Sequence, residues 1–147
     1  MGDVMEIDKK ILNLLLKNAK KAYKRGEIPV SAVILDQFGN LISSGINNRQ
    51  NDYNVLGHAE ISTILKAEKK IKDWRLDGYY MIVTLEPCDM CSTVIKESRL
   101  DKVFYFLPKT NDNDSREINI AKDQIINYEE YSIKFKQLLT DFFNNKR

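Results

Sequence analysis

The sequence is poor in residues that bind soft metals or form covalent crosslinks. Its 147 residues include two cysteines and one histidine. Two cysteines cannot build the disulfide framework of a small secreted protein, so we expect a reducing compartment. The longest apolar clusters, Leu14–Leu16 and Met81–Leu85, fall far short of the 18 or more residues that a membrane span requires. These shortages exclude a disulfide scaffold and predict no contact with a membrane.

The chain also lacks a strong charge of either sign. Lys and Arg number 23 and Asp and Glu number 21, so the formal net charge is only +2. Any binding of nucleic acid must therefore depend on local patches. The first six residues are acidic rather than basic, so they do not form a secretory signal. Without a Pro/Gly-rich linker, we expect a single domain over residues 1–147 and a cytoplasmic location.

Hydrophobic periodicity predicts a regular series of helices and strands. In chain order these are a helix over 7–23, strands over 29–35 and 41–46 joined by a turn, a helix over 58–71, a strand over 79–84, a helix with Pro87 in its first turn, strands over 103–106 and 124–128, and a helix from 130 onward. The stretches 47–57 and 107–121 are polar and are expected to be irregular. This order predicts a layered α/β domain with a mixed sheet.

All the soft metal ligands belong to two short motifs. His58 opens one predicted helix, and Cys88 and Cys91 open another about 30 residues later. The three-residue spacing of the cysteines places both sulfurs on one helix face. The unpaired N–H groups at a helix N-terminus favour thiolate, the form that binds a metal. A catalytic zinc uses three protein ligands and leaves a position for water, so these residues predict a catalytic zinc site.

Glu60 lies two residues after His58 in the first of these motifs. It is too close in sequence to His58 to serve naturally as a fourth ligand, but its carboxylate can reach a water on the metal. Zinc lowers the pKa of such a water from about 15.7 toward about 7. We therefore predict that Glu60 is the catalytic residue that carries the proton.

The two motifs together match the known H-x-E…P-C-x-x-C signature of zinc-dependent nucleobase deaminases. Beyond the signature, the chain resembles the bacterial tRNA-specific adenosine deaminases more closely than the cytidine deaminases. The similar segments are 29–33, Asn47, 57–61, 74–76, 83–91 and 141–143. The resemblance implies a three-layer α/β/α cytidine deaminase-like domain with a mixed five-stranded sheet. One departure is Ser31, where the family usually has glycine, and we expect it to affect pocket shape rather than chemistry.

The resemblance also implies a reaction, a cofactor and partners. The reaction is hydrolytic deamination of the wobble adenosine in a tRNA anticodon to inosine, with Zn²⁺ as cofactor and a homodimer as the working unit. Glu60 would move the proton, Asn47 would hydrogen-bond the base, and Val30 and Ala59 would complete the substrate site. The Cys88 backbone N–H would stabilise charge on the attacking oxygen. An anticodon loop suits this chemistry because its bases leave the stack at least cost.

Three other interpretations remain open. A thioredoxin-like redox pair would explain the cysteines, but its aromatic and Gly-Pro context is absent and it leaves His58 and Glu60 unused. The segment 107–121 is shorter and more acidic than its family counterpart, with only Lys109 and Arg116 as cations. That difference favours a free purine base or nucleoside, such as guanine, as an alternative substrate. The third alternative is a non-catalytic zinc or RNA-binding module.

A set of basic residues lies along and just after the first predicted helix. They are Lys17, Lys20, Lys21, Lys24 and Arg25. We interpret them as the solvated face of the helix, with contact to RNA as the alternative function.

Overall fold

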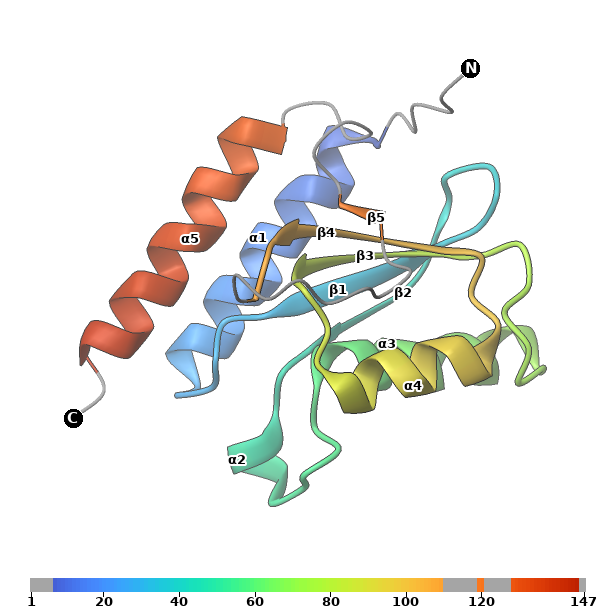
Figure 1. Ribbon diagram of the computed structural model, residues 1–147, viewed down its shortest axis with the longest axis horizontal. Coiled ribbons are helices and arrows are strands. Elements are labelled where there is room, and N and C mark those ends of the chain that lie inside the picture. Colours follow the sequence, from blue (N-terminus) through green and yellow to red (C-terminus); the bar gives the residue numbers. More distant parts are fainter. Residues whose placement is uncertain (1–6, 110–118, 121–127, 146–147) are drawn as a thin grey trace.

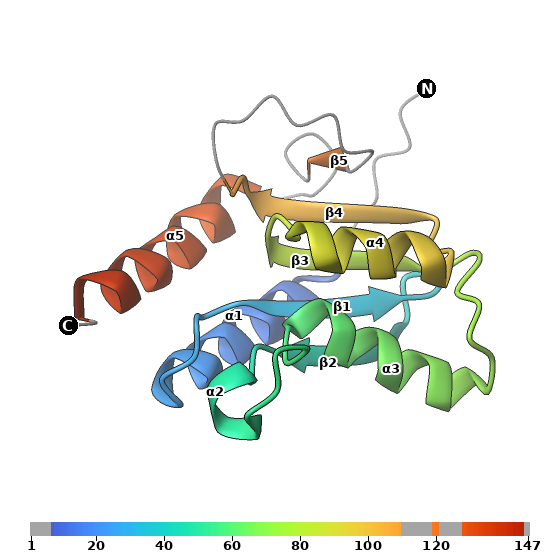
Figure 2. The ribbon, with the colours of Figure 1, turned by 60° about the horizontal axis from the view of Figure 1, so that its bottom comes forward.

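The computed structural model describes residues 7–109, 119–120 and 128–145. The helices are α1 (Lys9–Lys24), α2 (Arg49–Asp52), α3 (Ala59–Ile71), α4 (Asp89–Ser98) and α5 (Tyr128–Asn145), and the strands are β1 (Ser31–Leu35), β2 (Leu41–Ile46), β3 (Tyr80–Leu85), β4 (Lys102–Leu107) and β5 (Asn119–Ile120). A sheet lies between α1 and α5 on one face and α3 and α4 on the other (Figures 1 and 2). In the described part of the chain, no helix is long and apolar enough to cross a membrane.

The sheet has the strand order β2-β1-β3-β4-β5. β1 pairs antiparallel with both β2 and β3, whereas β3 pairs parallel with β4 and β4 with β5. The predicted mixed sheet is therefore confirmed. Because β2 and β3 run in the same direction, the helices that follow them, α3 and α4, begin at the same edge of the sheet.

The prediction of five strands was only partly right. Four strands of five or six residues form the body of the sheet, and β5 adds only two residues beside β4. Of the predicted strand over 124–128, residues 124–127 lie outside the described residues and Tyr128 begins α5. Tyr128 therefore belongs to α5 rather than to a strand. Its side chain and that of Tyr131, three residues later, both pack into the core, which is the spacing of a helix.

Each face of the sheet has its own apolar cluster. All five residues of β1 are buried, as expected of a strand covered on both faces. Val33 and Leu35 belong to the cluster under α1 and α5, whereas Ala32 and Ile34 belong to the cluster under α3 and α4. Side chains that alternate along β1 therefore belong to the two clusters in turn. The two clusters hold the helices at fixed positions on the sheet.

Two elements differ from their predicted form, and one residue has a contact that was not predicted. The stretch expected to be irregular contains the short helix α2, whose N–H groups are bound by the distant Glu27. Pro87 lies before the N-cap of α4 rather than in its first turn, because Cys88 is the N-cap residue. Ser31 donates from its Oγ to the Leu15 carbonyl oxygen at 2.6 Å, so this residue joins β1 to α1 and lies within the core.

Candidate metal centre and active site

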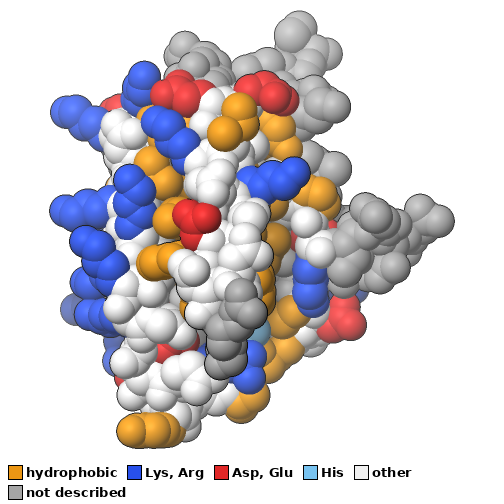
Figure 3. All heavy atoms as spheres, turned by 90° about the vertical axis from the view of Figure 1, so that its left-hand side faces the viewer, with side chains coloured by type: hydrophobic (Ala, Val, Ile, Leu, Met, Phe, Trp, Pro, Cys, Tyr) orange, Lys and Arg blue, Asp and Glu red, His pale blue; other side chains and the backbone are white. Residues whose placement is uncertain are grey.

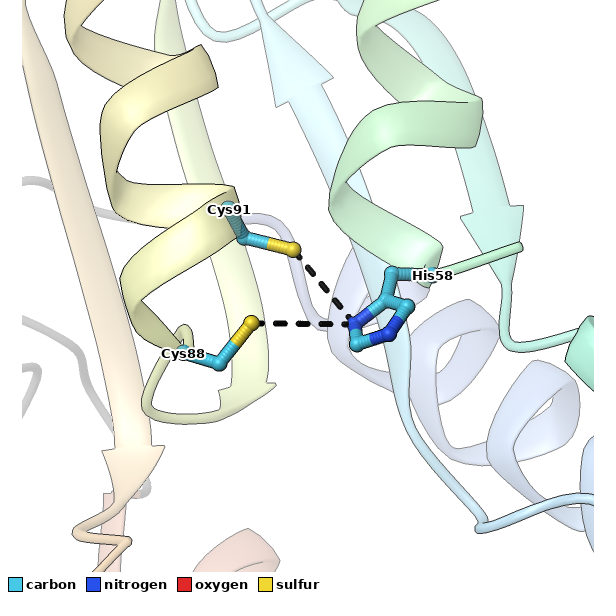
Figure 4. Close-up of side chains that lie close together, drawn as sticks. All are labelled: His58, Cys88 and Cys91. Atoms are coloured by element: carbon cyan, nitrogen blue, oxygen red, sulfur yellow. Dashed lines mark hydrogen bonds between the residues drawn. The ribbon is translucent and has the colours of Figure 1, made fainter. Parts of the chain in front are cut away.

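The site is built at the first turns of α3 and α4. His58 is the N-cap of α3 and Cys88 the N-cap of α4, both with extended backbone, and neither side chain caps its own helix. Cys91 lies in the first turn of α4 and is buried. Figure 4 shows the three side chains pointing toward one another from these two helices. The sequence motifs therefore converge in space as predicted.

The donor atoms lie close to the spacing of ligands around a tetrahedral metal. His58 Nδ1 lies 3.5 Å from Cys91 Sγ and 3.9 Å from Cys88 Sγ, and the three donor atoms lie within 4.8 Å of one another. Ligand atoms bound to tetrahedral zinc at 2.0–2.3 Å are separated by roughly 3.3–3.8 Å. Both cysteines are free thiols, and both approach the imidazole. The one His and two Cys fit zinc, and their number leaves a fourth position for water.

Electrostatics at the ligands depend on burial. Burial, followed by the positive charges of Arg49 and Lys109, lowers the pKa of His58, which favours the neutral imidazole that binds a metal. Burial, together with the neighbouring Glu60 carboxyl and Cys88 sulfur, raises the pKa of the Cys91 thiol. Burial therefore opposes the thiolate that the helix N-terminus favours at Cys91. Zinc binding must displace the Cys91 proton, so it is coupled to proton release.

Glu60 lies in the first turn of α3 with only 4% of its surface exposed. Burial raises the pKa of its carboxyl to about 7, although a hydrogen bond with the Cys91 side chain acts in the opposite direction. The carboxyl is thus placed against the metal-binding group. A carboxyl with a pKa near 7 can both accept and release a proton at neutral pH.

Asn47 supplies the helix cap that His58 does not. Its Oδ1 accepts a hydrogen bond from the Ala59 backbone N–H at 2.9 Å, while its own N–H donates to the Val30 carbonyl oxygen at 3.2 Å. With Oδ1 engaged on α3, Nδ2 is the side-chain group left to donate elsewhere. Val30 and Ala59 are both buried, and each contacts Asn47 through its backbone. The sequence indicated that Asn47 belonged to the site but gave no sign of its capping role.

Two residues that were not predicted to belong to the site also position it. Gly45 lies against the first turns of α3: a Cβ added there would approach the Ala59 carbonyl oxygen to 2.7 Å and the Thr63 nitrogen to 2.9 Å. Glu27 is only 2% exposed and accepts hydrogen bonds from the Gln50 and Asn51 backbone N–H groups. Burial alone would raise the pKa of Glu27, but the bonds from Asn51 and Gln50 hold it below its usual value. An acidic residue next to a predicted strand was the only sequence signal.

A three-layer α/β/α fold with one His and two Cys at paired helix N-termini defines the class of zinc-binding deaminase domains. The chain belongs to the cytidine and deoxycytidylate deaminase family, because the profile of that family's zinc-binding region matches residues 5–107. The predicted cofactor, zinc, and the predicted deaminase class are therefore confirmed.

Within this family, the chain is similar to bacterial tRNA-specific adenosine deaminases. The chain is 34% identical over 142 residues to a tRNA-specific adenosine deaminase of Aquifex aeolicus, covering 92% of this chain and 93% of the relative. It is 38% identical over 107 residues to a tRNA-specific adenosine deaminase of Bacillus subtilis. That second alignment covers 71% of this chain and 66% of the relative, just under two thirds of its length. The predicted kinship with bacterial tRNA-specific adenosine deaminases is confirmed.

Solved structures agree on the fold. A structure from work on A-to-I editing by tRNA:A34 deaminases at the wobble position has a TM-score of 0.67 and 26% identity, covering 76% of this chain and 95% of that one. A guanine deaminase of Bacillus subtilis has a TM-score of 0.62 and 25% identity, covering 95% of this chain and 97% of that one.

Proposed function

We propose that the protein hydrolytically deaminates the wobble adenosine of a tRNA anticodon to inosine, using zinc. The observation that carries this proposal is the convergence of His58, Cys88 and Cys91 beside the buried carboxyl of Glu60. The reaction class follows from that donor set and an adjacent proton carrier. The substrate is suggested by relatives that are named for tRNA adenosine and align with most of the chain.

Each site residue has a distinct role in this proposal. His58, Cys88 and Cys91 would hold the zinc, which supplies the nucleophile by lowering the pKa of water toward about 7. Glu60 would accept one proton from the attacking water and deliver it to N1 of the adenine. It would then carry the second proton of that water, from the hydroxyl now on C6, to the amine, which leaves as ammonia. Because Glu60 is buried and its pKa is about 7, it can perform both the uptake and the release.

The substrate contacts follow from the hydrogen bonds around Asn47. Its Nδ2 would donate to the base, while the backbone groups of Val30 and Ala59 hold the amide in place. The Cys88 N–H, at the N-cap of α4, would stabilise negative charge that develops on the attacking oxygen. These contacts select a base that has already left its stack, as in an anticodon loop.

A free purine such as guanine is the second candidate substrate. The structural likeness to a guanine deaminase over nearly the whole chain favours it. The tRNA proposal is better supported, because the relatives at 34% and 38% identity are tRNA-specific. A non-catalytic zinc or RNA-binding module is the third candidate, and a buried proton carrier beside the ligands argues against it.

We also propose a homodimer of single-domain chains, spanning 1–147, that works in the cytoplasm, where tRNA is modified. Five large apolar side chains along the loop before α3, on α3 and just after it are between 49% and 96% exposed; they are Tyr53, Val55, Leu56, Leu65 and Trp74. Leu65 lines one hollow together with Leu56 and another together with Trp74, and charged side chains line both hollows as well. Surfaces of this kind mark interfaces, and a dimeric mass in dilute solution is the expected result.

The direct test is to treat total tRNA with the zinc-loaded protein and sequence the positions of inosine. Inosine should form at the wobble position, and Glu60→Gln should lower the rate about 100- to 10,000-fold while zinc stays bound. Glu68→Gln, on the same helix but two turns further along, is the matched control and should retain full activity. Unchanged tRNA together with ammonia release from guanine would instead support the second candidate. Full activity of Glu60→Gln would contradict the mechanism.

A further inference from the structure

The polar side of α1 carries a compact group of cations, which we call the α1 basic patch. It consists of Lys17, Lys20, Lys21, Lys24 and Arg25, all of them exposed. The four lysines line a hollow of about 410 Å³ together with Asn13 and Leu16. Figure 3 views the molecule from the side of α1 and α5 and shows Lys and Arg side chains gathered along one edge of that face.

The patch is not neutralised by the protein itself. Helix α1 contains no acidic residue, and in the described part of the chain none of the five cations forms a salt bridge. The whole chain nevertheless has a net charge of only +2, so acidic residues are in excess elsewhere. Like charges at three- and four-residue spacing on a helix destabilise it slightly, so a solvated face of this kind gains from an external anion.

The patch lies beside the loop that leads into the site. The Arg25 carbonyl oxygen accepts a hydrogen bond from Asn51 Nδ2 at 3.1 Å, and Glu27, two residues later, binds the backbone of α2. The α2 loop is in turn closed by a 2.8 Å hydrogen bond from the Asn48 N–H to the Gly57 carbonyl oxygen. Gly57 directly precedes His58, so the α2 loop, which leads from β2 to α3 (Figure 2), contacts the end of α1 at Arg25 and ends at a predicted metal ligand.

The partner of such a patch must be a hydrophilic polyanion. The apolar side of α1, including Leu12, Leu15 and Ala19, is fully buried against the sheet and α5. A membrane-surface helix needs that apolar side to enter the lipid, whereas contact with phosphates of nucleic acid needs only the cations. The patch covers eight residues of helix, about 12 Å, which is long enough to face successive phosphates of one strand.

We propose that the α1 basic patch binds the phosphate backbone of the tRNA stem next to the anticodon loop while that loop occupies the site. This inference rests on the proposed tRNA function and adds a surface to it. It also assigns a use to the cations of the first helix in a chain with few cations in segment 107–121. Binding through phosphates implies affinity without sequence preference and a strong dependence on salt.

The test compares two variants with the same change in net charge. One replaces Lys17, Lys20, Lys21 and Lys24 with Gln, and the control replaces four exposed lysines on α3, α4 and α5, namely Lys69, Lys96, Lys134 and Lys136, with Gln. The zinc-loaded full chain is assayed on an anticodon hairpin with its stem and on a loop-only oligonucleotide. Direct binding of both RNAs is measured at several salt concentrations, and thermal midpoints confirm folding.

For the patch variant we expect KM on the hairpin to rise at least about tenfold near 0.1 M salt, with kcat within about twofold. The slope of log K against log salt should fall by about 3, since each phosphate contact contributes about 0.7–0.9. The control variant and the loop-only RNA should show neither change. These results would distinguish a phosphate-binding surface from a general effect of net charge.

Other outcomes overturn the inference in recognisable ways. Equal losses in both variants, or no loss in either, would show that the patch is not a binding surface. Binding of the wild type to phosphatidylserine vesicles, lost in the patch variant while hairpin binding is unchanged, would assign the patch to a membrane. If the wild type leaves the wobble adenosine unchanged, the proposed function fails. Hairpin binding by the patch and control variants would still show whether the α1 basic patch binds RNA.

Discussion

Helix α1 and the two site helices, α3 and α4, begin in different ways. At α1, Asp8 is the N-cap and its Oδ1 accepts from the Lys10 N–H at 2.9 Å. At α3 and α4, the N-cap side chains of His58 and Cys88 make no capping hydrogen bond and point toward a shared metal position. An N-cap is worth about 1 kcal/mol, so the site helices give up stability that α1 retains.

At α3 the lost cap is replaced from outside the helix. Asn47 Oδ1 reaches the Ala59 N–H of α3 from a loop twelve residues earlier in the chain, and Gly45 lets β2 support the same turn closely. Zinc would supply the remaining stabilisation, because it binds only the folded arrangement of the three ligands. At α1 the N-cap residue caps its own helix. At α3 the N-cap residue, His58, is a predicted metal ligand, and Asn47 from another segment does the capping.

The largest expected effect comes from removing a ligand. Cys91→Ser should abolish both zinc binding and deamination, because among the described residues only three ligands converge on the metal position. In the wild type, zinc at 100 times Kd should raise the unfolding free energy by about 2.7 kcal/mol, and the thermal midpoint should rise with it. In Cys91→Ser it should not. Metal content and midpoints with and without a chelator measure this.

The neighbouring residue offers a matched control for that experiment. Ser92 Oγ is buried without a hydrogen-bond partner in the described structure, so Ser92→Ala removes an unsatisfied group and should keep zinc binding and stability near wild type. Zinc binding retained by Cys91→Ser, or lost in Ser92→Ala, would refute the assigned ligand set.

The next effect concerns the support under α3. Gly45→Ala places a Cβ within 2.7 Å of the Ala59 carbonyl oxygen and 2.9 Å of the Thr63 nitrogen. Because both are backbone atoms, the helix must move, and we expect a loss of about 1–3 kcal/mol in unfolding free energy together with weaker zinc binding. Urea unfolding and zinc titration measure the two. Ser44→Ala, which points to the other face of β2, should change neither, and an unaffected Gly45→Ala would show that the contact does not position the site.

The smallest effect separates capping from catalysis. Asp8→Ala and Asn47→Ala should each lower the unfolding free energy by about 1 kcal/mol, but only Asn47→Ala should lose activity. Asn47→Asp keeps an acceptor for the Ala59 N–H and removes the Nδ2 donor, so it should retain stability and lose deamination. Unfolding curves and inosine formation are the measurements. Activity of Asn47→Asp equal to wild type would exclude Asn47 as a donor to the base.

Local patterns predicted the parts of the structure that depend on near neighbours. Strand β2 over 41–46 was predicted without error, and α3 begins within one residue of its predicted start. The pairing of His58 with Cys88 and Cys91 was also predicted, because ligand type and spacing are written in two short motifs. Helix α2 was not predicted, since it depends on Glu27, more than twenty residues before it.

The sequence by itself determined the order of elements, the three metal ligands and the presence of an acid beside them, because hydrophobic period and residue spacing are local properties. Only the tertiary structure decided the burial that raises the pKa of Glu60 and Cys91, the cap that Asn47 provides and the place of the α1 basic patch beside the site loop. Burial and hydrogen bonding between distant segments set these features, and neither exists until the chain has folded.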